Sequence, residues 1–381
     1  MDLHRRQFLA LGTAASAGPC TITPPPVTPV KSLVPRAPLK ISENRLTHIT
    51  VCTRPFRPAG PRIEAERFGE KTVIHNYGHG GSGWSLSWGC ADAAVALAKA
   101  TQARTFAVIG AGVIGLTTAL RLVQLGVDVT IYAIDLPRET RSARATGVWS
   151  PSSRIGLHSA VPGGFGDTWE AWTRSAYKTH LQFVGSVGRP IEYVPFYQLR
   201  SNEPREPVPE TRDFLHLWSR IRDLGPSGKT LTDDAHRFPV ASAREGAGIA
   251  INISAYTDRI VRDFLAHGGR LIRKDFPDRA TALSLPEPVI MNCTGYGAKT
   301  LWGAEDLVPV RGQINWLPPQ PEARYGLVYN DAYVLSRGDG LILQNIGPND
   351  DFGYGVEDET PDLDEMRATL GIVAPLFEGW T

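Results

Sequence analysis

The stretch TFAVIGAGVIGLTTALRLVQLGVDVTIYA contains three glycines at a spacing that can hold a pyrophosphate. Gly110 permits a tight turn, Gly112 lets the backbone approach phosphate oxygens, and Gly115 lets a helix pack closely on a strand. The N-terminus of the following helix would face the phosphates with its partial positive charge. The predicted contacts in this turn are Gly110, Gly112, Val113, Ile114 and Gly115.

The elements around this turn have the order that a dinucleotide site requires. Phe106 to Ile109 predict an apolar strand, Leu116 to Leu125 have helical spacing, and Val127 to Tyr132 alternate as a second strand. An acidic ribose partner is expected about twenty residues after the last glycine, and Asp135 stands there, slightly beyond the strand end. The complete βαβ pattern favours nucleotide binding, but it does not separate FAD from NAD.

A second stretch, KTVIHNYGHGGSGWSLSWGC at residues 71–90, combines histidines with many glycines. His75 and His79 have the spacing of a metal-binding helix, but the glycines disfavour a helix there and no third ligand is near, so we predict no metal. One alternative is a glycine-rich β-turn. We favour a loop that lets a flat ligand press against bare backbone, followed by a helix capped by Ser85 or Ser87, because a helix N-terminus suits an anionic ring edge.

Both stretches are similar to those of one known family. HNYGHGGSGWSLSWGCA closely resembles the signature of the D-amino-acid oxidase family of flavoproteins, and TRPFRPAGPRIEAE resembles that family's arginine-bearing strand. Further matches are GAGVIGLTTAL, TGVWSP, MNCTGYGAKTL, PVRGQ and VYNDAYVLSR. Together these motifs touch nearly the whole chain from about residue 42 to its end.

The order of the motifs differs from that of the family. In the family the FAD turn opens the chain, whereas here the arginine strand and the glycine–histidine loop come first and AKATQART joins them to the FAD strand. The segment DETPDLDEMRATLGIVAPLFEGWT resembles the helix that normally leads into the arginine strand. The sequence is therefore interpreted as circularly permuted, which a compact fold tolerates when its ends are close in space. The alternative is a rearranged reading frame whose product does not fold.

The resemblance implies an α/β fold in which a Rossmann-like FAD-binding domain is interleaved with a substrate domain on a mixed or antiparallel sheet. The FAD-binding domain would comprise residues 63–155 and 240–308. The substrate domain would comprise residues 42–62, 156–239 and 309–381.

The resemblance also implies FAD-dependent oxidative deamination of neutral D-amino acids by dioxygen, which yields 2-oxo acids, ammonia and hydrogen peroxide. Arg54 matches the family's carboxylate clamp, and a guanidinium fork suits a carboxylate. Tyr329 and Tyr333 match tyrosines over the substrate, and Gly81 matches the glycine whose carbonyl holds the amino group. Without the resemblance, Arg54 would be read as a surface arginine and the tyrosines as core aromatics.

The remaining site residues follow from the same matches. Arg311 and Gln313 of PVRGQ are assigned a structural role at a domain junction. Gln344 and Asn345 depart from the family, because they replace a glycine-rich stretch beside the pocket. The predicted cofactor contacts beyond the glycine turn are Asp135, Thr146, Gly147, Val148, Gly80, Gly81, Ser82, Gly83, Trp84 and Ser85.

Two other functions stay open at this point. One is oxidation or dehydrogenation of glycine or an N-methyl amino acid on the same fold, and the other is a flavin-binding scaffold without turnover. No second arginine is evident near the tyrosines, so acidic D-amino acids are not specifically favoured. The oligomeric state is left open.

Composition excludes several classes of partner. The 381 residues include 42% hydrophobic and 21% charged residues with a formal net charge of +1, which gives no electrostatic footprint for nucleic acid or anionic lipid. The sequence contains no run of eighteen or more apolar residues, so no membrane span is predicted. None of the four cysteines forms a C-x-x-C pair, so neither zinc nor a redox dithiol is indicated.

The first twenty residues, MDLHRRQFLALGTAASAGPC, resemble a twin-arginine export signal. Arg5 and Arg6 precede an apolar run and an Ala-Ser-Ala cleavage pattern. Residues 21–41 predict a proline-rich linker, so the folded part is expected to start near Ile41. We therefore expect an exported protein, which would be cytoplasmic if the signal does not function.

Overall fold

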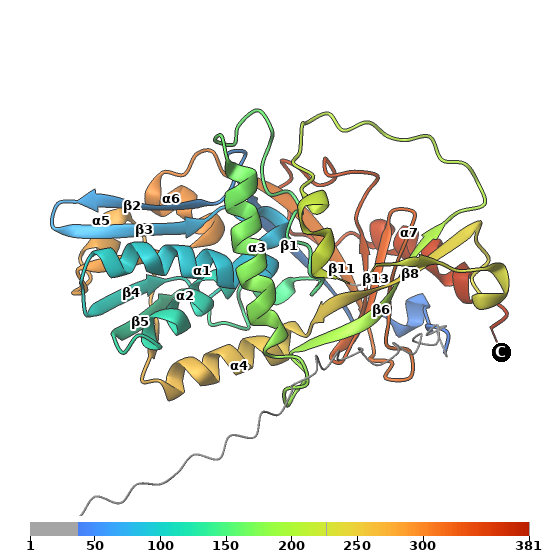
Figure 1. The fold of residues 1–381 in the computed structure, drawn as a ribbon, viewed down its shortest axis with the longest axis horizontal. Helices are drawn as coiled ribbons and strands as arrows, with labels where there is room; N and C mark the ends of the chain where they lie inside the picture. Colours follow the sequence, from blue (N-terminus) through green and yellow to red (C-terminus); the bar gives the residue numbers. More distant parts are fainter. Residues whose placement is uncertain (1–36, 226, 381) are drawn as a thin grey trace, which may run out of the picture. The chain divides into compact units, whose positions relative to one another are not determined.

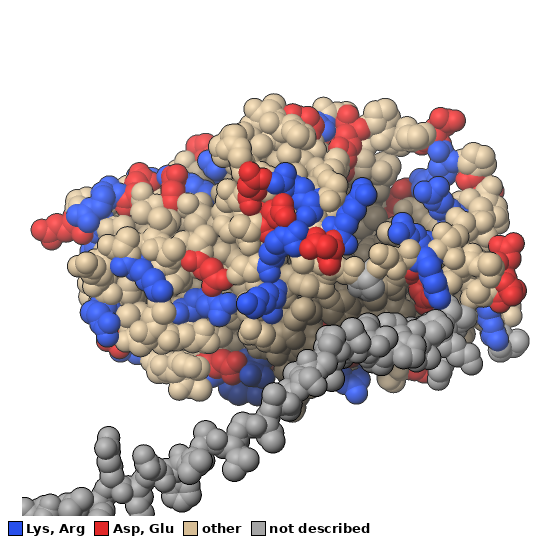
Figure 2. Space-filling view, in the orientation of Figure 1, with Lys and Arg blue, Asp and Glu red and all other residues tan. Residues whose placement is uncertain are grey.

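The computed structural model describes residues 37–225 and 227–380 (Figure 1). The export signal predicted for residues 1–20 and most of the linker predicted for residues 21–41 lie outside them. On the face shown in Figure 2, Lys and Arg side chains are interspersed with Asp and Glu, so neither sign dominates that face. No helix in the described part of the chain is long and apolar enough to cross a membrane.

The first sheet has six strands and carries the predicted βαβ unit. All neighbouring strands in it are parallel except the antiparallel pair at one edge, β2 and β3. Its strands, in spatial order, are β2 (Arg62–Phe68), β3 (Lys71–Tyr77), β10 (Val289–Asn292), β4 (Thr105–Ile109), β5 (Asp128–Ala133) and β9 (Arg270–Arg273).

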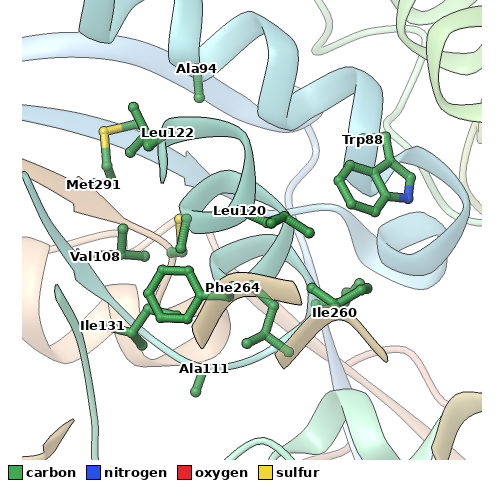
Figure 3. Packing of buried hydrophobic residues seen from close by; sticks show 14 of the residues in the cluster. Trp88, Ala94, Val108, Ala111, Leu120, Leu122, Ile131, Ile260, Phe264 and Met291 are labelled. Atoms are coloured by element: carbon green, nitrogen blue, oxygen red, sulfur yellow. The ribbon is translucent and has the colours of Figure 1, made fainter. Parts of the chain in front are cut away.

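Helices cover both faces of this sheet, as the continuous apolar runs of its strands require. On one face lie α1 (Gly83–Ala100), α2 (Val113–Val123) and α4 (Ile253–Ala266), whose side chains form a buried cluster with Val108 and Ile131 (Figure 3). On the other face, α5 (Arg279–Leu283) and α6 (Ala298–Trp302) pack on Ala107 and Ile109. A further helix, α3 (Phe165–Leu181), packs against α1.

The predicted helix boundaries need correction at two places. The helix after the glycine turn is α2, which begins at Val113 rather than Leu116 because the turn runs directly into it. The helix after the glycine–histidine loop is α1, which begins at Gly83 with Ser82 as its N-cap residue. The predicted N-cap at Ser85 or Ser87 is therefore wrong, because the 3₁₀ turn Gly80–Ser82 continues straight into the helix.

The second sheet has eight strands and is mixed, as predicted. Every neighbouring pair is antiparallel except β6 and β12. Its strands, in spatial order, are β1 (His48–Phe56), β11 (Val308–Leu317), β14 (Gly340–Asn345), β13 (Ala332–Arg337), β12 (Gly326–Tyr329), β6 (Ile191–Arg200), β8 (Ser242–Ile251) and β7 (Lys229–Thr230).

Alternate residues of this second sheet face different surroundings, because successive side chains of a strand point to opposite faces. On one face, Ala332 and Val334 pack with α7 (Leu363–Val373). On the other face, Tyr333 and Leu335 pack with Ile314 on β11. This second face lines the cavity described below.

The two ends of the described chain come together in one cluster. Leu39 is buried with Leu376 and Phe377, and the Arg367 Nε of α7 donates to Glu43 Oε1 at 3.2 Å. Segments N-terminal to β4, the strand before the glycine turn, are also integral to both sheets, since β1 pairs with β11 and β3 pairs with β10.

Candidate active site

A cavity of about 1640 Å³ is bordered by the ends of β4 and β5, the glycine–histidine loop and the face of the eight-stranded sheet that bears Tyr333. Its volume exceeds that of an ordinary small-ligand pocket, about 300–1,000 Å³. Two ligands can therefore share it.

The glycine turn forms one end of the cavity. Gly110, Gly112, Val113 and Ile114 line it, and the N-terminus of α2 opens onto it. Gly115 does not line the cavity. A Cβ at this position would lie 1.9 Å from the Gly110 carbonyl oxygen, so the helix packs directly against the turn here. The role of Gly115 is the close helix–strand packing that the sequence predicts.

Polar residues that sequence reasoning missed complete this end. Ser142 Oγ accepts from the backbone N–H of Val113 at 3.1 Å, and Thr140 and Arg141 line the cavity beside it. Asp135, the predicted ribose partner, also lines the cavity. The run of polar residues shortly after Asp135 is the signal that marks this segment.

The glycine–histidine loop forms a second wall. Gly80, Gly81, Gly83 and Trp84 line the cavity, but the other two predicted contacts do not. Ser82 Oγ donates to the carbonyls of Ser150 and Ser153, and Ser85 Oγ accepts from the Ser150 N–H at 2.7 Å. Ser82 and Ser85 therefore hold the neighbouring turn, because the helix starts early enough to direct both hydroxyls away from the cavity.

The two histidines of this loop do not meet. His75 Nε2 bonds to Glu66 and its Nδ1 to Asn292, whereas His79 lines the cavity. Burial lowers the pKa of His75 to about 4 and that of His79 to about 3, so both are neutral at pH 7. Within the described ranges, the potential metal ligands that cluster are Glu210, His216 and Asp350, far along the chain from the two histidines.

Arg54 and Tyr333 line the same cavity, as predicted. The Arg54 guanidinium donates to the Arg311 carbonyl at 3.3 Å and lies over Gly312, where a Cβ would be 2.2 Å from Nη2. In the described part of the chain, no carboxylate forms an ion pair with Arg54. Tyr333 stacks on Phe196 with ring centroids 5.5 Å apart, and burial raises the pKa of its hydroxyl.

Tyr329 is not brought to the cavity. A turn at Asn330, with φ of 51°, separates β12 from β13 and places Val328 directly opposite Tyr333. Val328 therefore faces the cavity, while Tyr329 packs with the cluster on the other side of the sheet. The prediction for Tyr329, made from the match of VYNDAYVLSR to the family, is therefore wrong, because the matched segment includes a turn that puts Tyr329 on the other side of the sheet.

Arg154 also lines the cavity, although no sequence feature singled it out. Its side chain is 7% exposed, lies 3.3 Å from the Asp350 carboxylate and donates through Nε to the Asp350 carbonyl at 2.8 Å. Burial and the charge of Arg54 lower the pKa of Arg154 to about 10. Asp350 neutralises Arg154, whereas Arg54 has no such partner in the described part of the chain and is available to a ligand carboxylate.

The loop predicted to line the flavin does line the cavity, through Thr146, Gly147 and Val148. Arg337, which is 2% exposed, donates to the carbonyls of Ala145 and Thr146 at 3.1 and 3.0 Å. Its guanidinium also binds both carboxylate oxygens of Asp339. A buried arginine thus fixes this loop against the eight-stranded sheet.

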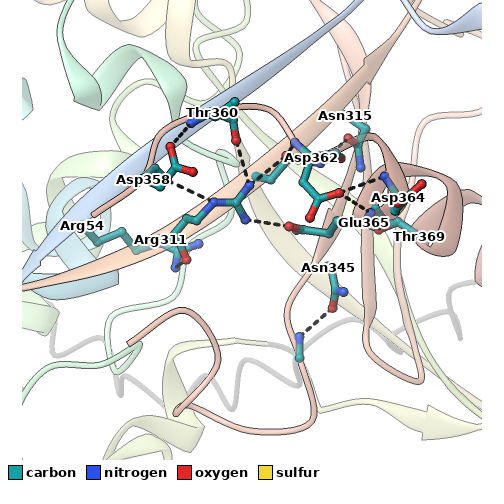
Figure 4. Close-up of polar contacts among 12 residues, drawn as sticks. Arg54, Arg311, Asn315, Asn345, Asp358, Thr360, Asp362, Asp364, Glu365 and Thr369 are labelled. Carbon is teal, nitrogen blue, oxygen red and sulfur yellow. Dashed lines mark hydrogen bonds and ion pairs between the residues drawn. The ribbon is translucent and has the colours of Figure 1, made fainter. Parts of the chain in front are cut away.

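Arg311 has the structural role that the sequence predicts (Figure 4). It pairs with Glu365 of α7 at 2.6 Å and donates to the carbonyls of Asp358 and Thr360. Because its own carbonyl accepts from Arg54, the network that docks α7 also supports the Arg54 guanidinium. Gln313 donates to the Asp362 carbonyl at 2.7 Å.

Comparison with known proteins gives matches over most of the chain. The family model for FAD dependent oxidoreductases (DAO) matches residues 105–379. The D-amino-acid oxidase of Dictyostelium discoideum is 26% identical over 278 residues, which cover 71% of this chain and 73% of the relative. The D-amino-acid oxidase of Schizosaccharomyces pombe is 25% identical over 295 residues, which cover 74% of this chain and 80% of the relative.

Among solved structures, glycine oxidase from Geobacillus kaustophilus superposes with a TM-score of 0.50 at 16% identity. The superposition covers 71% of this chain and 77% of that one. At this identity the likeness shows the fold alone.

Proposed function

Because the chain belongs to the DAO family of FAD-dependent oxidoreductases, we propose that it oxidises neutral D-amino acids to 2-oxo acids. The D-amino-acid oxidases of the two organisms named above support this class of substrate. The observation that carries the proposal is Arg54, a cavity guanidinium without an ion-pair partner in the described part of the chain. Tyr333 lines the same cavity.

The residues of the cavity fit FAD. The N-terminus of α2 and its glycines suit a pyrophosphate, and the bare backbone of Gly80 and Gly81 suits a flat ring. FAD supplies the redox chemistry of this family, since it accepts a hydride and passes the electrons to dioxygen, which leaves as hydrogen peroxide.

The chain's own residues would bind and orient the substrate. Arg54 would hold the carboxylate through paired hydrogen bonds. The Tyr333 hydroxyl would donate a hydrogen bond to a carboxylate oxygen, and its ring would shield the site from water. The Gly81 carbonyl would accept a hydrogen bond from the amino group. Such positioning lowers the barrier because the reacting atoms meet in one geometry. Loss of a hydride from Cα and a proton from the amino group would turn the amino acid into an imine, which water would hydrolyse to the 2-oxo acid and ammonia.

We also infer that the fold is circularly permuted. The family match begins at the FAD strand, yet β1 and β3, which precede it, complete the two sheets. The meeting of Leu39 with Phe377 supports the short connection that a permutation requires.

The test is the visible spectrum of the purified protein during anaerobic addition of D-alanine and then L-alanine. We expect the D-enantiomer alone to bleach the flavin band. Bleaching by glycine or N-methylglycine alone would favour the alternative substrate class. A flavin band that no amine bleaches would favour a scaffold without turnover.

Arg54→Ala tests the clamp. The variant should keep its flavin spectrum but lose D-amino-acid turnover, because the carboxylate has lost its charged partner. Arg67→Ala, which alters an exposed arginine on β2, serves as the matched control and should keep activity. Unchanged turnover in Arg54→Ala would remove the assigned role.

A further inference from the structure

We propose that Gln344 recognises a hydrogen-bond acceptor on the side chain of the substrate. The site would then select amino acids with short polar side chains over apolar ones of the same shape. The inference rests on the proposed function, because it takes Arg54 as the carboxylate clamp.

Gln344 lies on β14, is 4% exposed and lines the cavity. Its Oε1 accepts a hydrogen bond from the Thr146 hydroxyl. This bond orients the amide and leaves Nε2, with two N–H donors, as the free end. In the described part of the chain, Thr146 is the side chain that bonds to this amide.

The register of the sheet places this amide beside the clamp. Gln344 lies directly opposite Tyr333 on β13 and Ile314 on β11. Gly312, under the Arg54 guanidinium, is two residues from Ile314 and lines the cavity with it. Gly312 and Gln344 are therefore diagonal cross-strand neighbours, with Cα atoms about 7–8 Å apart. A substrate held by Arg54 has its short side chain within reach of Nε2.

An unpaired amide donor makes the site selective. When an apolar side chain displaces water from Nε2, the donor loses its partner and binding weakens. Sites built around such a polar group discriminate strongly against analogues that lack the matching atom. Because this cavity is open to water in part, we expect a preference of about tenfold or more, well below the largest values known for closed sites.

Matched substrate pairs test the selectivity. D-Serine and D-2-aminobutyrate differ by a hydroxyl in place of a methyl group, and D-asparagine and D-leucine are similar in shape. The wild-type enzyme should show a higher kcat/KM for the polar member of each pair. A wild-type preference for the apolar members would overturn the inference.

Gln344→Met keeps the length of the side chain but removes both donors. We expect the polar-to-apolar ratio of kcat/KM to fall to about one or below, while the flavin spectrum stays unchanged. Gln124→Met, at the C-cap of α2 and outside the cavity lining, is the matched control and should keep the wild-type ratio. A ratio in Gln344→Met equal to that of the wild type would overturn the inference.

Gln344→Glu separates a donor role from an acceptor role. A carboxylate at this position accepts but cannot donate. The preference for O-methyl-D-serine, whose ether oxygen can only accept, over D-norvaline should therefore be present in the wild type and lost in Gln344→Glu. Retention of that preference in Gln344→Glu would mean that Nε2 does not read the substrate, against the inference. Failure of the wild type to oxidise any D-amino acid would instead overturn the proposed function, on which the inference depends.

Discussion

At the scale of single residues, the position of Arg54 depends on a glycine. A side chain at residue 312 would occupy the place of the guanidinium, since the nearest approach of a Cβ to Nη2 would be 2.2 Å. Gly312→Ala should therefore displace the clamp and raise KM for D-amino acids by about tenfold, which corresponds to about 1.4 kcal/mol. The flavin spectrum should not change.

Steady-state kinetics with D-alanine checks this expectation. Gly371→Ala on α7 is the control, because a Cβ there meets no atom within 4 Å. An unaltered KM in Gly312→Ala would show that the guanidinium does not need its observed position.

Asp350 sets the charge of the same cavity by neutralising Arg154. Asp350→Asn should leave two uncompensated guanidinium groups, because Arg54 has no carboxylate partner in the described part of the chain. The kcat/KM for D-aspartate relative to D-alanine should rise about tenfold, since opposite charges attract strongly where water is partly excluded.

The ratio of the two substrates is the measurement, and Asp331→Asn is the control. Asp331 pairs with Arg205, and neither residue is among those that line the cavity. If Asp350→Asn and Asp331→Asn give the same ratio, Arg154 does not contribute to substrate selection.

Sequence and structure agree most closely where backbone geometry restricts the residue type. The glycine turn was predictable because Gly110 adopts a φ of 111° that few other residues tolerate. The place of Arg54 in the cavity was predictable because the motif around it is highly specific. Arg154 and Arg337 were not, because their roles arise from partners about 190 residues further along or back and no local pattern encodes such contacts.

At the scale of elements, the turn between β12 and β13 shows a further limit of sequence patterns. The resemblance to the family places Tyr329 and Tyr333 over the substrate together, but a turn reverses the chain and leaves Val328 opposite Tyr333. The βαβ unit of the six-stranded sheet was predictable from apolar runs and alternation, whereas the mixed sheet was expected only from the resemblance to the family. Their strand order depends on distant pairings that local patterns do not contain.

The loop that carries Thr146 depends on Arg337 of β13. Removing this side chain leaves two loop carbonyls and the Asp339 carboxylate without their partner. Breaking a buried ion pair typically costs about 3–5 kcal/mol. Arg337→Ala should therefore lower the free energy of unfolding by roughly that amount and weaken FAD binding.

Urea unfolding and FAD titration provide the measurements. Arg205→Ala is the control, because its pair with Asp331 is largely exposed and such pairs contribute about 0–1 kcal/mol. Equal losses in the two variants would mean that Arg337 does not fix the loop.

At the scale of the whole molecule, three buried histidines make stability depend on pH. Burial lowers the pKa of His75 and His180 to about 4 and that of His79 to about 3. The unfolded chain, with histidine pKa values near 6.5, binds protons that the folded protein cannot. The contribution of the three neutral histidines to the free energy of unfolding is therefore complete above pH 6.5 and is lost as the pH falls from 6.5 towards 4.

When the pH is lowered from 7 to 5, protonation of each histidine in the unfolded chain should lower the free energy of unfolding by roughly 2 kcal/mol. Urea unfolding at the two pH values measures the change. Raising the pH from 7 to 8 should change little, because the unfolded histidines are then already mostly neutral. Equal stability at pH 7 and pH 5 would show that these side chains take up protons in the folded state.

The proposed permutation predicts that the chain can be relinked without loss of the fold. Joining Trp380 to Leu39 by a flexible linker of about ten residues, which spans roughly 15–20 Å, and opening the chain between Gln102 and Ala103 would restore the motif order of the family. Leu39 and Trp380 belong to one cluster, and the opened segment connects α1 to β4 outside both sheets. All contacts of the two sheets are then kept.

The relinked protein should bind FAD with the same visible spectrum and unfold within a few degrees of the original, because changing a loop's length alters its closure entropy only slowly. A chain of the original order carrying the same linker at its C-terminus is the control. A relinked chain that stays colourless while the control binds FAD would argue against the permutation, because the contacts within the sheets would then depend on where the chain begins.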